Sequence, residues 1–165
     1  MASAHIILGI DPGLAHTGWG VVQQAGSQLS CVAYGCVATN SQDALAVRLA
    51  KINEQIAAVI AKYQPTALGI ESVWFGENTS SAFATGQARG AALVACAGLE
   101  VAEFTPRQIK LAIVGTGTAE KEQVQFMVQK LLGLPAPPEP DHAADALAAA
   151  ICFTSQNTLS QLETK

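Results

Sequence analysis

Two short apolar runs in this chain each end in a carboxylate, and they limit the folds open to it. Asp11 follows the run at residues 6–10, and Glu71 follows the run at residues 67–70. Short apolar runs bounded by turn residues are typical of strands covered on both faces. A charge at the end of such a strand costs free energy unless something pairs with it. The two runs therefore predict buried strands whose acidic ends need a partner.

The patterns between and after these runs predict an α/β fold. Residues 18–24 and 28–38 have the character of two further strands, joined as a hairpin through residues 25–27. Residues 43–63 carry apolar side chains at steps of three or four, which predicts an amphipathic helix. A last short strand is expected at residues 99–104. We therefore predict a mixed sheet, with its first three strands antiparallel and the later ones parallel, flanked by helices.

Later helices are predicted from periodicity and capping residues. They are expected over residues 80–97, 106–113, 119–132 and 141–153. Gly86 and Gly90 should allow close packing against the first of them, and Thr118 can cap the third. We predict one domain over residues 1–154 and a polar, flexible tail over residues 155–165.

Composition narrows the function classes. Of the 165 residues, half are apolar and 13% are charged, and no apolar stretch is long enough to predict a membrane span. The four cysteines are scattered without a CxxC pair, as expected for reduced thiols in a cytosolic protein. The net charge of −4 argues against a polyanionic partner, but two bound divalent cations would neutralise it. Five of the nine basic side chains also lie between residues 89 and 130.

A third acidic segment predicts a metal site. Asp141, His142 and Asp145 lie at the start of an Ala-rich helix. Asp145 comes four residues after Asp141 and three after His142, so it can share a helix face with either of them. With Asp11 and Glu71 at strand ends, three or four carboxylates can meet at one point, and divalent cations relieve their repulsion. Each residue alone has a structural alternative: a turn at Asp11, a charge leaving the core at Glu71, an N-cap at Asp141.

Six motifs resemble the RuvC family of bacterial Holliday-junction resolvases, within the ribonuclease H-like superfamily. They occur in the family's order and spacing across residues 5–153: GIDPG at 9–13, IESV at 70–73, GQARG at 86–90, PRQIK at 106–110, VG with AEK at 114–121, and AADALA at 143–148. One such motif is weakly specific, but six in register are highly specific. The resemblance implies a homodimeric endonuclease that nicks two opposed strands of a four-way DNA junction in recombination and repair.

The resemblance also implies a ligand set. It assigns Asp11, Glu71 and Asp145 to a site for two Mg²⁺ ions, with Mn²⁺ expected to substitute. Some members have Asp where this chain has His142, and others have His, so the fourth ligand is expected to be His142, with Asp141 as second choice. Two ions would activate water and stabilise the departing 3′-oxygen. A nitrogen ligand favours Mn²⁺, so Mn²⁺ should support cleavage at least as well as Mg²⁺.

DNA contacts are implied at six further side chains. Trp74 and Phe75 lie on a loop after Glu71 and are expected to stack on bases, or else to pack under the next helix. Arg107, Lys110 and Lys121 match the family's phosphate contacts, with pairing to Glu120 or Glu122 as the alternative for Lys121. Arg89 is a DNA-binding candidate whose alternatives are an internal salt bridge or a dimer contact.

The family further implies a bacterial cytoplasmic protein that works with the RuvA–RuvB branch-migration complex. Two other function classes stay open at this point. One is a junction-binding module without cleavage, and the other is an actin-like ATPase or sugar-kinase domain, which shares a similar opening motif but needs two such domains. Junction cleavage and ATP binding would separate these alternatives.

Overall fold

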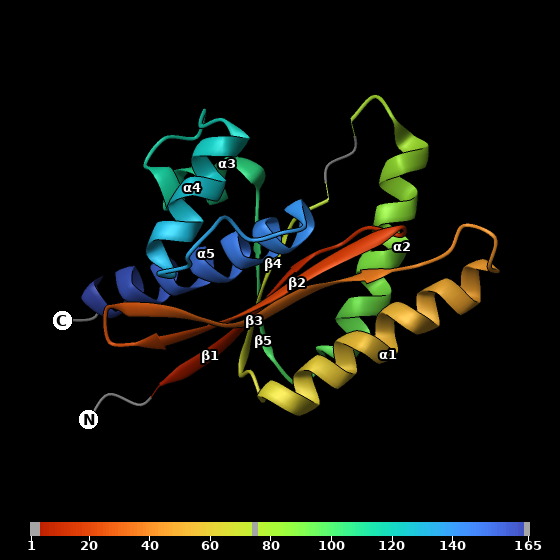
Figure 1. Cartoon of the computed structure of the whole chain (residues 1–165), viewed down its shortest axis with the longest axis horizontal. Helices are drawn as coiled ribbons and strands as arrows, with labels where there is room; N and C mark the ends of the chain where they lie inside the picture. The colour runs from red at the N-terminus through yellow and green to blue at the C-terminus, as the bar shows by residue number, and fades with distance from the viewer. Residues whose placement is uncertain (1–3, 74–75, 164–165) are drawn as a thin grey trace.

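A five-stranded sheet lies at the centre of the computed structural model, which describes residues 4–73 and 76–163 (Figure 1). The strand order is β3-β2-β1-β4-β5. The strands are β1 His5–Asp11, β2 His16–Ala25, β3 Gln28–Ala38, β4 Ala67–Glu71 and β5 Glu100–Phe104. β1, β2 and β3 pair antiparallel, whereas β4 is parallel to both β1 and β5. The predicted mixed sheet is confirmed.

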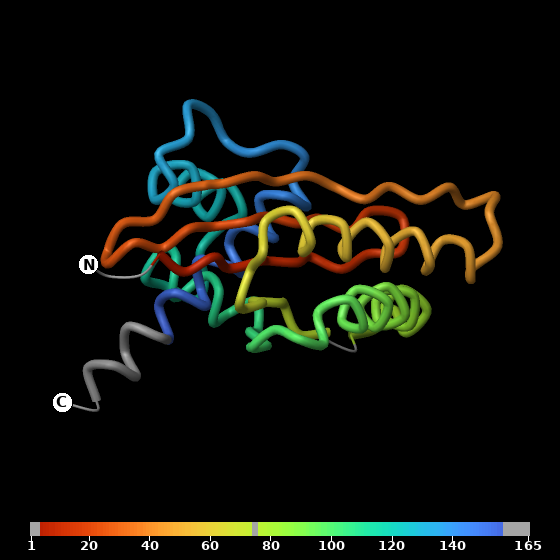
Figure 2. The backbone as a smooth tube through the Cα atoms, turned by 90° about the horizontal axis from the view of Figure 1, so that it is seen from below, coloured from red at the N-terminus to blue at the C-terminus, as the bar shows by residue number. Residues whose placement is uncertain are grey.

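Five helices cover this sheet in the described part of the chain. They are α1 Leu45–Tyr63, α2 Thr79–Ala95, α3 Pro106–Val114, α4 Lys121–Leu131 and α5 Asp141–Glu163. α1 and α2 lie side by side, away from α3 and α4, in both views of the backbone (Figures 1 and 2). Within the described residues, no helix combines the length and the apolar character that crossing a bilayer requires.

The alternation of side chains along the strands divides the core into two halves. Leu8 and Ile10 of β1 join Leu68 and Ile70 of β4 in a cluster closed by α1 and α2, with Ile52 at its centre. The residues between them point the other way, toward α5. That second cluster contains Ile7, Val22 and Ala67 from the strands and the Ala-rich segment 147–153 of α5, together with side chains from α3 and α4.

α5 lies unusually close to the sheet because four glycines face it. Gly20, Gly9 and Gly69 are direct neighbours across β2, β1 and β4. A β-carbon on Gly9 would fall well inside contact distance of the Ala146 carbonyl oxygen, and the same holds for Gly69 against the backbone of α5. Gly18 would meet the carbonyl group of His142 in the same way. We call the surface formed by Gly9, Gly18, Gly20 and Gly69 the α5 face of the sheet.

Several predicted helix boundaries were wrong, among them the end of α2, which lies at Ala95 and not at residue 97. α1 begins at Leu45, not residue 43, because Ala44 is extended at φ −58° and ψ 145°. α4 begins at Lys121, where Glu120 is the cap residue and its N–H donates to Gln123 Oε1 at 2.8 Å. The hydroxyl of Thr118 instead bonds that of Thr116.

The largest error concerns the end of α5. The helix continues past residue 153 to Glu163, since no Gly or Pro follows to stop it. The division into a domain at residues 1–154 and a flexible tail stays a prediction.

Candidate active site

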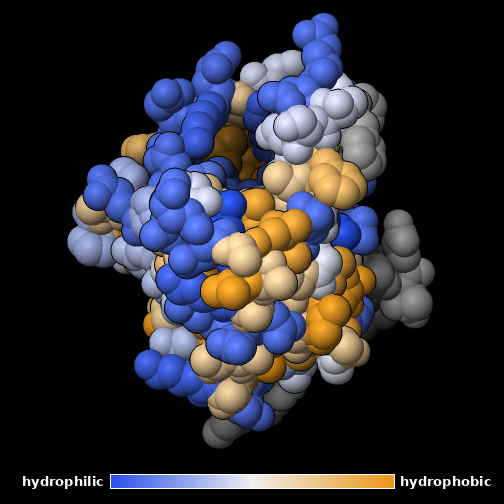
Figure 3. Space-filling model, turned by 90° about the vertical axis from the view of Figure 1, so that its right-hand side faces the viewer, coloured by the Kyte–Doolittle hydropathy of each residue, from blue (hydrophilic) through white to orange (hydrophobic). Residues whose placement is uncertain are grey.

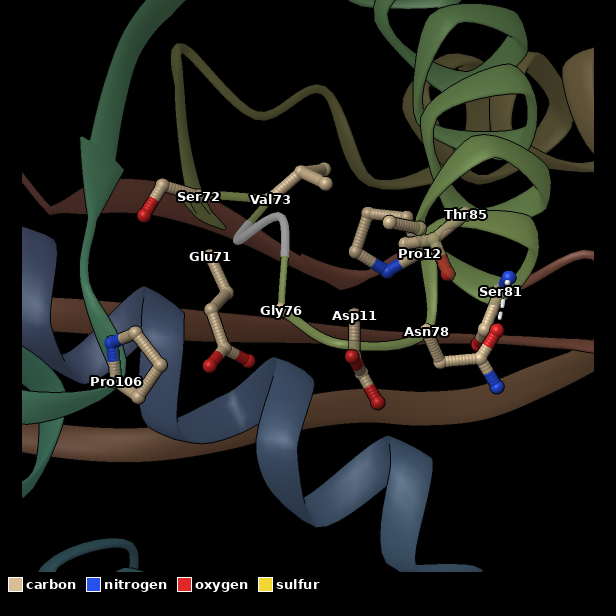
Figure 4. A pocket seen from close by; sticks show the side chains of 11 residues that line it. Asp11, Pro12, Glu71, Ser72, Val73, Gly76, Asn78, Ser81, Thr85 and Pro106 are labelled. Atoms are coloured by element: carbon tan, nitrogen blue, oxygen red, sulfur yellow. Dashed lines mark hydrogen bonds between the residues drawn. The ribbon is translucent and has the colours of Figure 1, made fainter.

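Strand alternation turns both strand-end carboxylates toward α5. Asp11 lies two residues after Gly9, and Glu71 lies two residues after Gly69, so each shares its glycine's side of the sheet. The partners Ile10 and Ile70 come just before them, which places the two acids at neighbouring strand ends. Figure 4 shows both side chains projecting from the sheet toward α5. The predicted convergence of Asp11 and Glu71 is therefore seen in the structure.

α5 brings two further predicted residues to the same place. His142 lies in its first turn, where the contact with Gly18 fixes the backbone. Its Nδ1 is 2.9 Å from Asp11 Oδ2, so the ring and the carboxylate form a hydrogen-bonded pair. Asp145 comes three residues later and lines a cavity with Glu71. Both residues were predicted to lie in one metal site, but their direct hydrogen bond, which joins positions 131 residues apart, was not predicted.

An ammonium group from α4 lies at the edge of this cluster. Lys121 Nζ is 3.2 Å from Asp141 Oδ2 and 3.8 Å from Asp145 Oδ2. Asp141 also accepts a hydrogen bond from Gln125 Nε2 at 3.0 Å. The expected N-cap role of Asp141 is wrong, since it is the first residue of α5 and its carboxylate is directed to α4. The alternative partners proposed for Lys121, Glu120 and Glu122, are likewise replaced by these two aspartates.

Burial and mutual repulsion weaken the acidity of the carboxylates. Desolvation, helped by the charges of Asp11 and Asp145, raises the pKa of Glu71 from 4.5 to about 7. The pKa of Asp145 rises to about 6, again chiefly through burial and then through Asp11. Burial also raises the pKa of Asp11, although its hydrogen bond to His142 opposes the shift. A cation at this point would reverse these shifts by stabilising the charged forms.

The donors fit a hard divalent cation, though not yet as a closed cage. Among the described residues, no group of three or more His, Cys, Asp and Glu side chains is arranged tightly enough to hold an ion. One pair is already suitable: 2.9 Å between Asp11 Oδ2 and His142 Nδ1 matches the roughly 3 Å between adjacent ligands of an octahedral ion at about 2.1 Å. The crowded carboxylates of Asp11, Glu71 and Asp145 repel one another, and a divalent cation would relieve this repulsion, as the Lys121 ammonium partly does beside Asp145.

An open cleft of about 360 Å³ adjoins Asp11 and Glu71. Its opposite wall is formed by three polar side chains from α2 and the residue before it, none of which the sequence pattern singled out: Asn78, Ser81 and Thr85. A second cavity beside Glu71 and Asp145 is lined by Lys110 and Lys121. Two of the predicted phosphate contacts therefore border the acidic site. Arg107 is exposed on α3 next to them.

The other predicted DNA contacts have different outcomes. Arg89 Nη2 lies 2.8 Å from Glu103 Oε1, and the arginine side chain is only 15% exposed. Arg89 is thus in the internal salt bridge that the sequence left as an alternative, and in this conformation it is not a free phosphate contact. Trp74 and Phe75 lie outside the described residues, so their stacking role stays a prediction.

Fold and site together define a ribonuclease H-like nuclease domain. The sheet has the mixed order of that fold, with acidic residues at the ends of the central strands and on the last helix. The more specific assignment comes from known proteins. A family model described as crossover junction endodeoxyribonuclease RuvC matches residues 7–153. The chain belongs to this family.

Relatives agree over almost the whole chain. A crossover junction endodeoxyribonuclease RuvC of Hyphomonas neptunium is 51% identical over 88% of this chain and 88% of its own. A protein of the same name from Desulforamulus reducens is 48% identical over 89% of this chain and 91% of its own. The structure is similar to that of Thermus thermophilus RuvC in complex with a Holliday junction substrate, with a TM-score of 0.89 and 34% identity, covering 94% and 96% of the two chains.

Proposed function

We propose that this chain resolves four-way DNA junctions by paired symmetrical nicks, with Asp11, Glu71, His142 and Asp145 as its catalytic metal site. Family membership supports the reaction, since close relatives are named crossover junction endodeoxyribonucleases and a similar structure holds a Holliday junction. The observation that carries the site is the convergence of Asp11 and Glu71 on the α5 face opposite His142 and Asp145. The actin-like alternative is not favoured, because the matches cover the full domain of a nuclease family.

Metal dependence is a property of this nuclease family. We infer that Mg²⁺ is the ion, two per site, and that Mn²⁺ substitutes for it. When bound, such ions activate a water nucleophile and stabilise the departing oxygen. Asp11 would be the central residue of the set that holds the ions, because it lies between His142 on one side and Glu71 on the other. Cleavage with Mg²⁺ alone and none with Mn²⁺ would count against His142 as a direct ligand.

The chain's own residues supply the rest of the mechanism. Burial raises the pKa values of Glu71 and Asp145, so the binding of cations would release any protons that these carboxylates hold. Lys121 would leave Asp145 as ions enter and turn to the scissile phosphate, with Lys110 beside it. Arg107, on the adjacent surface of α3, would hold the phosphates that follow, and Trp74 and Phe75 are proposed to stack on the unpaired bases.

A homodimer would match the two-fold symmetry of the junction. On α2 the residues Phe83, Gly86, Gly90 and Val94 follow one stripe, and all four are exposed. Apart from the neighbouring residues of α2 itself, no described atom lies within 4 Å of where a β-carbon on either glycine would be, so the close packing they permit has no partner elsewhere in the described chain. Figure 3, viewed from the side that α1 and α2 form, shows apolar side chains gathered there. We infer that α2 of a second copy packs on this stripe.

We further infer a cytoplasmic protein that acts with the RuvA–RuvB complex, as the family resemblance implies. A sedimentation experiment with Phe83→Asp tests the dimer: the wild-type chain should sediment as a dimer and the variant as a monomer. A monomeric wild-type chain would contradict the proposed use of α2.

The main test uses a synthetic four-way junction with Mg²⁺ or Mn²⁺. The wild-type chain should make symmetrical nicks in two opposed strands. Asp11→Asn should lose at least about a hundredfold in cleavage rate, as expected when a metal ligand is lost, while its gel shift with the junction persists. His5→Ala, at the opposite end of β1, is the matched control and should cut normally. A gel shift without nicks from the wild-type chain would favour the junction-binding module without cleavage.

A further inference from the structure

His16 stacks on His142, at a place the proposed mechanism leaves unused. We propose that His16 is a positioning residue, which holds the His142 ring so that its Nδ1 faces Asp11. The inference rests on the proposed function, in which His142 is a metal ligand. His16 touches His142 and is not assigned any contact with DNA or the reacting atoms.

The contact follows from strand geometry. His16 is the first residue of β2 and lies two residues before Gly18, so both belong to the α5 face. The backbone of His142 sits directly over Gly18, which brings its ring alongside that of His16. The ring centroids are 5.6 Å apart and the planes differ by 18°, a nearly parallel stack.

His142 needs such support because little else restrains it. Its side chain is 45% exposed, and the last torsion of a histidine is intrinsically broad. The hydrogen bond from Nδ1 to Asp11 fixes one edge of the ring, but this is also the edge that an entering cation must take over. A stacked neighbour restrains the plane of the ring by a contact that survives the exchange of the hydrogen bond for a metal bond.

His16 is in turn held from the next strand. Cys36 of β3 is the register partner of Gly18, so its side chain is directed to the same face. Its Sγ lies 4.0 Å from His16 Nδ1, the outer limit of a sulfur hydrogen bond. A continuous series of contacts thus runs from Cys36 through His16 and His142 to Asp11. Groups that orient a metal ligand typically change metal affinity 10–100-fold when removed.

The experiment compares His16→Ala with His16→Phe, which keeps a planar ring, and with His5→Ala as the control. Mn²⁺ affinity is measured without DNA from the electron paramagnetic resonance signal of free Mn²⁺. We expect about tenfold weaker binding for His16→Ala, and binding within about twofold of wild type for His16→Phe and His5→Ala. Circular dichroism verifies that each variant is folded.

A second readout uses the metal-free protein. The chain has three histidines, so nitrogen-resolved NMR of the imidazole rings gives three assignable sets of signals. His16→Ala should shift the ring signals of His142, through loss of the ring current, and His5→Ala should leave them in place. Unchanged His142 signals in His16→Ala would overturn the proposal, and so would equal losses of Mn²⁺ affinity in the Ala and Phe variants.

The outcome for the proposed function is read separately. If the wild-type chain binds Mn²⁺ and Asp11→Asn abolishes that binding, while His16→Ala binds as wild type, only the positioning role of His16 fails. If the wild-type chain binds no Mn²⁺ in an Asp11-dependent way, the metal site itself is wrong and this inference falls with it.

Discussion

The two faces of the sheet are built in opposite ways. On the side of α1 and α2, large apolar side chains such as Leu8, Ile10 and Ile56 fill the space between sheet and helices. On the α5 face, glycines lie against the alanine-rich segment 143–150 of α5, and backbone meets backbone. The packing on the α1 and α2 side depends on side chains that can change rotamer, whereas the packing on the α5 face depends on main-chain atoms that cannot.

This difference explains where the site is. Carboxylates held by flexible packing would drift apart, because each like charge is stabilised by moving away from the others. On the α5 face the distance between helix and strands is set by direct backbone contact, so Asp11 and His142 keep their 2.9 Å separation. Among the described residues, the candidate metal ligands all lie at the α5 face, where the packing is least able to adjust.

The largest predicted effect is from Gly9→Ala. The new methyl group would overlap the Ala146 carbonyl, so α5 must move, and we expect a loss of about 1–3 kcal/mol in the free energy of unfolding. Urea denaturation measures this loss. Gly98→Ala, where nothing lies within 4 Å among the described atoms, should change stability by less than about 0.5 kcal/mol. Equal losses of stability in Gly9→Ala and Gly98→Ala would contradict the claim that the α5 face cannot adjust to an added methyl group.

An intermediate effect is expected from pH in the metal-free protein. The pKa of Glu71 is raised in the folded state, so protonation favours folding; this contribution is complete below pH 4.5 and is lost as the pH rises through about 7. The melting temperature should therefore fall between pH 5 and pH 8 more steeply for the wild-type chain than for Glu71→Gln. Saturating Mg²⁺ should remove the difference in slope. Parallel curves without metal would contradict the raised pKa.

The smallest effect should come from the opposite face. Ile56→Val removes one buried methylene and should cost about 0.5–1.5 kcal/mol, because the surrounding side chains relax around the gap. Mn²⁺ affinity should stay as in the wild-type chain, which calorimetric titration tests. A weakened metal site in this variant would show that the two faces are not independent.

Most of the fold could be predicted because most of its strands and helices have a recognisable pattern in the local sequence. The hairpin of β2 and β3, the buried β1 and β4, and the periodicity of α1 are each visible within about twenty residues. Caps were less predictable, since Thr118 and Glu120 both offer an oxygen near the start of α4. The Gln three residues after Glu120 was the signal that favoured the latter.

The site could be predicted only in part. Asp11 and Glu71 follow from strand ends, and Asp145 from its apolar surroundings, but their partners depend on how α5 is rotated against the sheet. That rotation is determined by the glycines at 9, 18, 20 and 69, whose meaning appears only when the strands are aligned. The ion pairs of Lys121 with Asp141 and Asp145, and the stack of His16 on His142, follow from the same rotation.

The absence of β-carbons beneath α5 has one more consequence. Turning the helix about its axis, or sliding it along the strands, would drive a main-chain oxygen into β1, β2 or β4. The helix is therefore held at one rotation and one axial position, which determines how far its first two turns lie from the strand ends. If the proposed metal site is right, ions would load through side-chain torsions and without a shift of secondary structure.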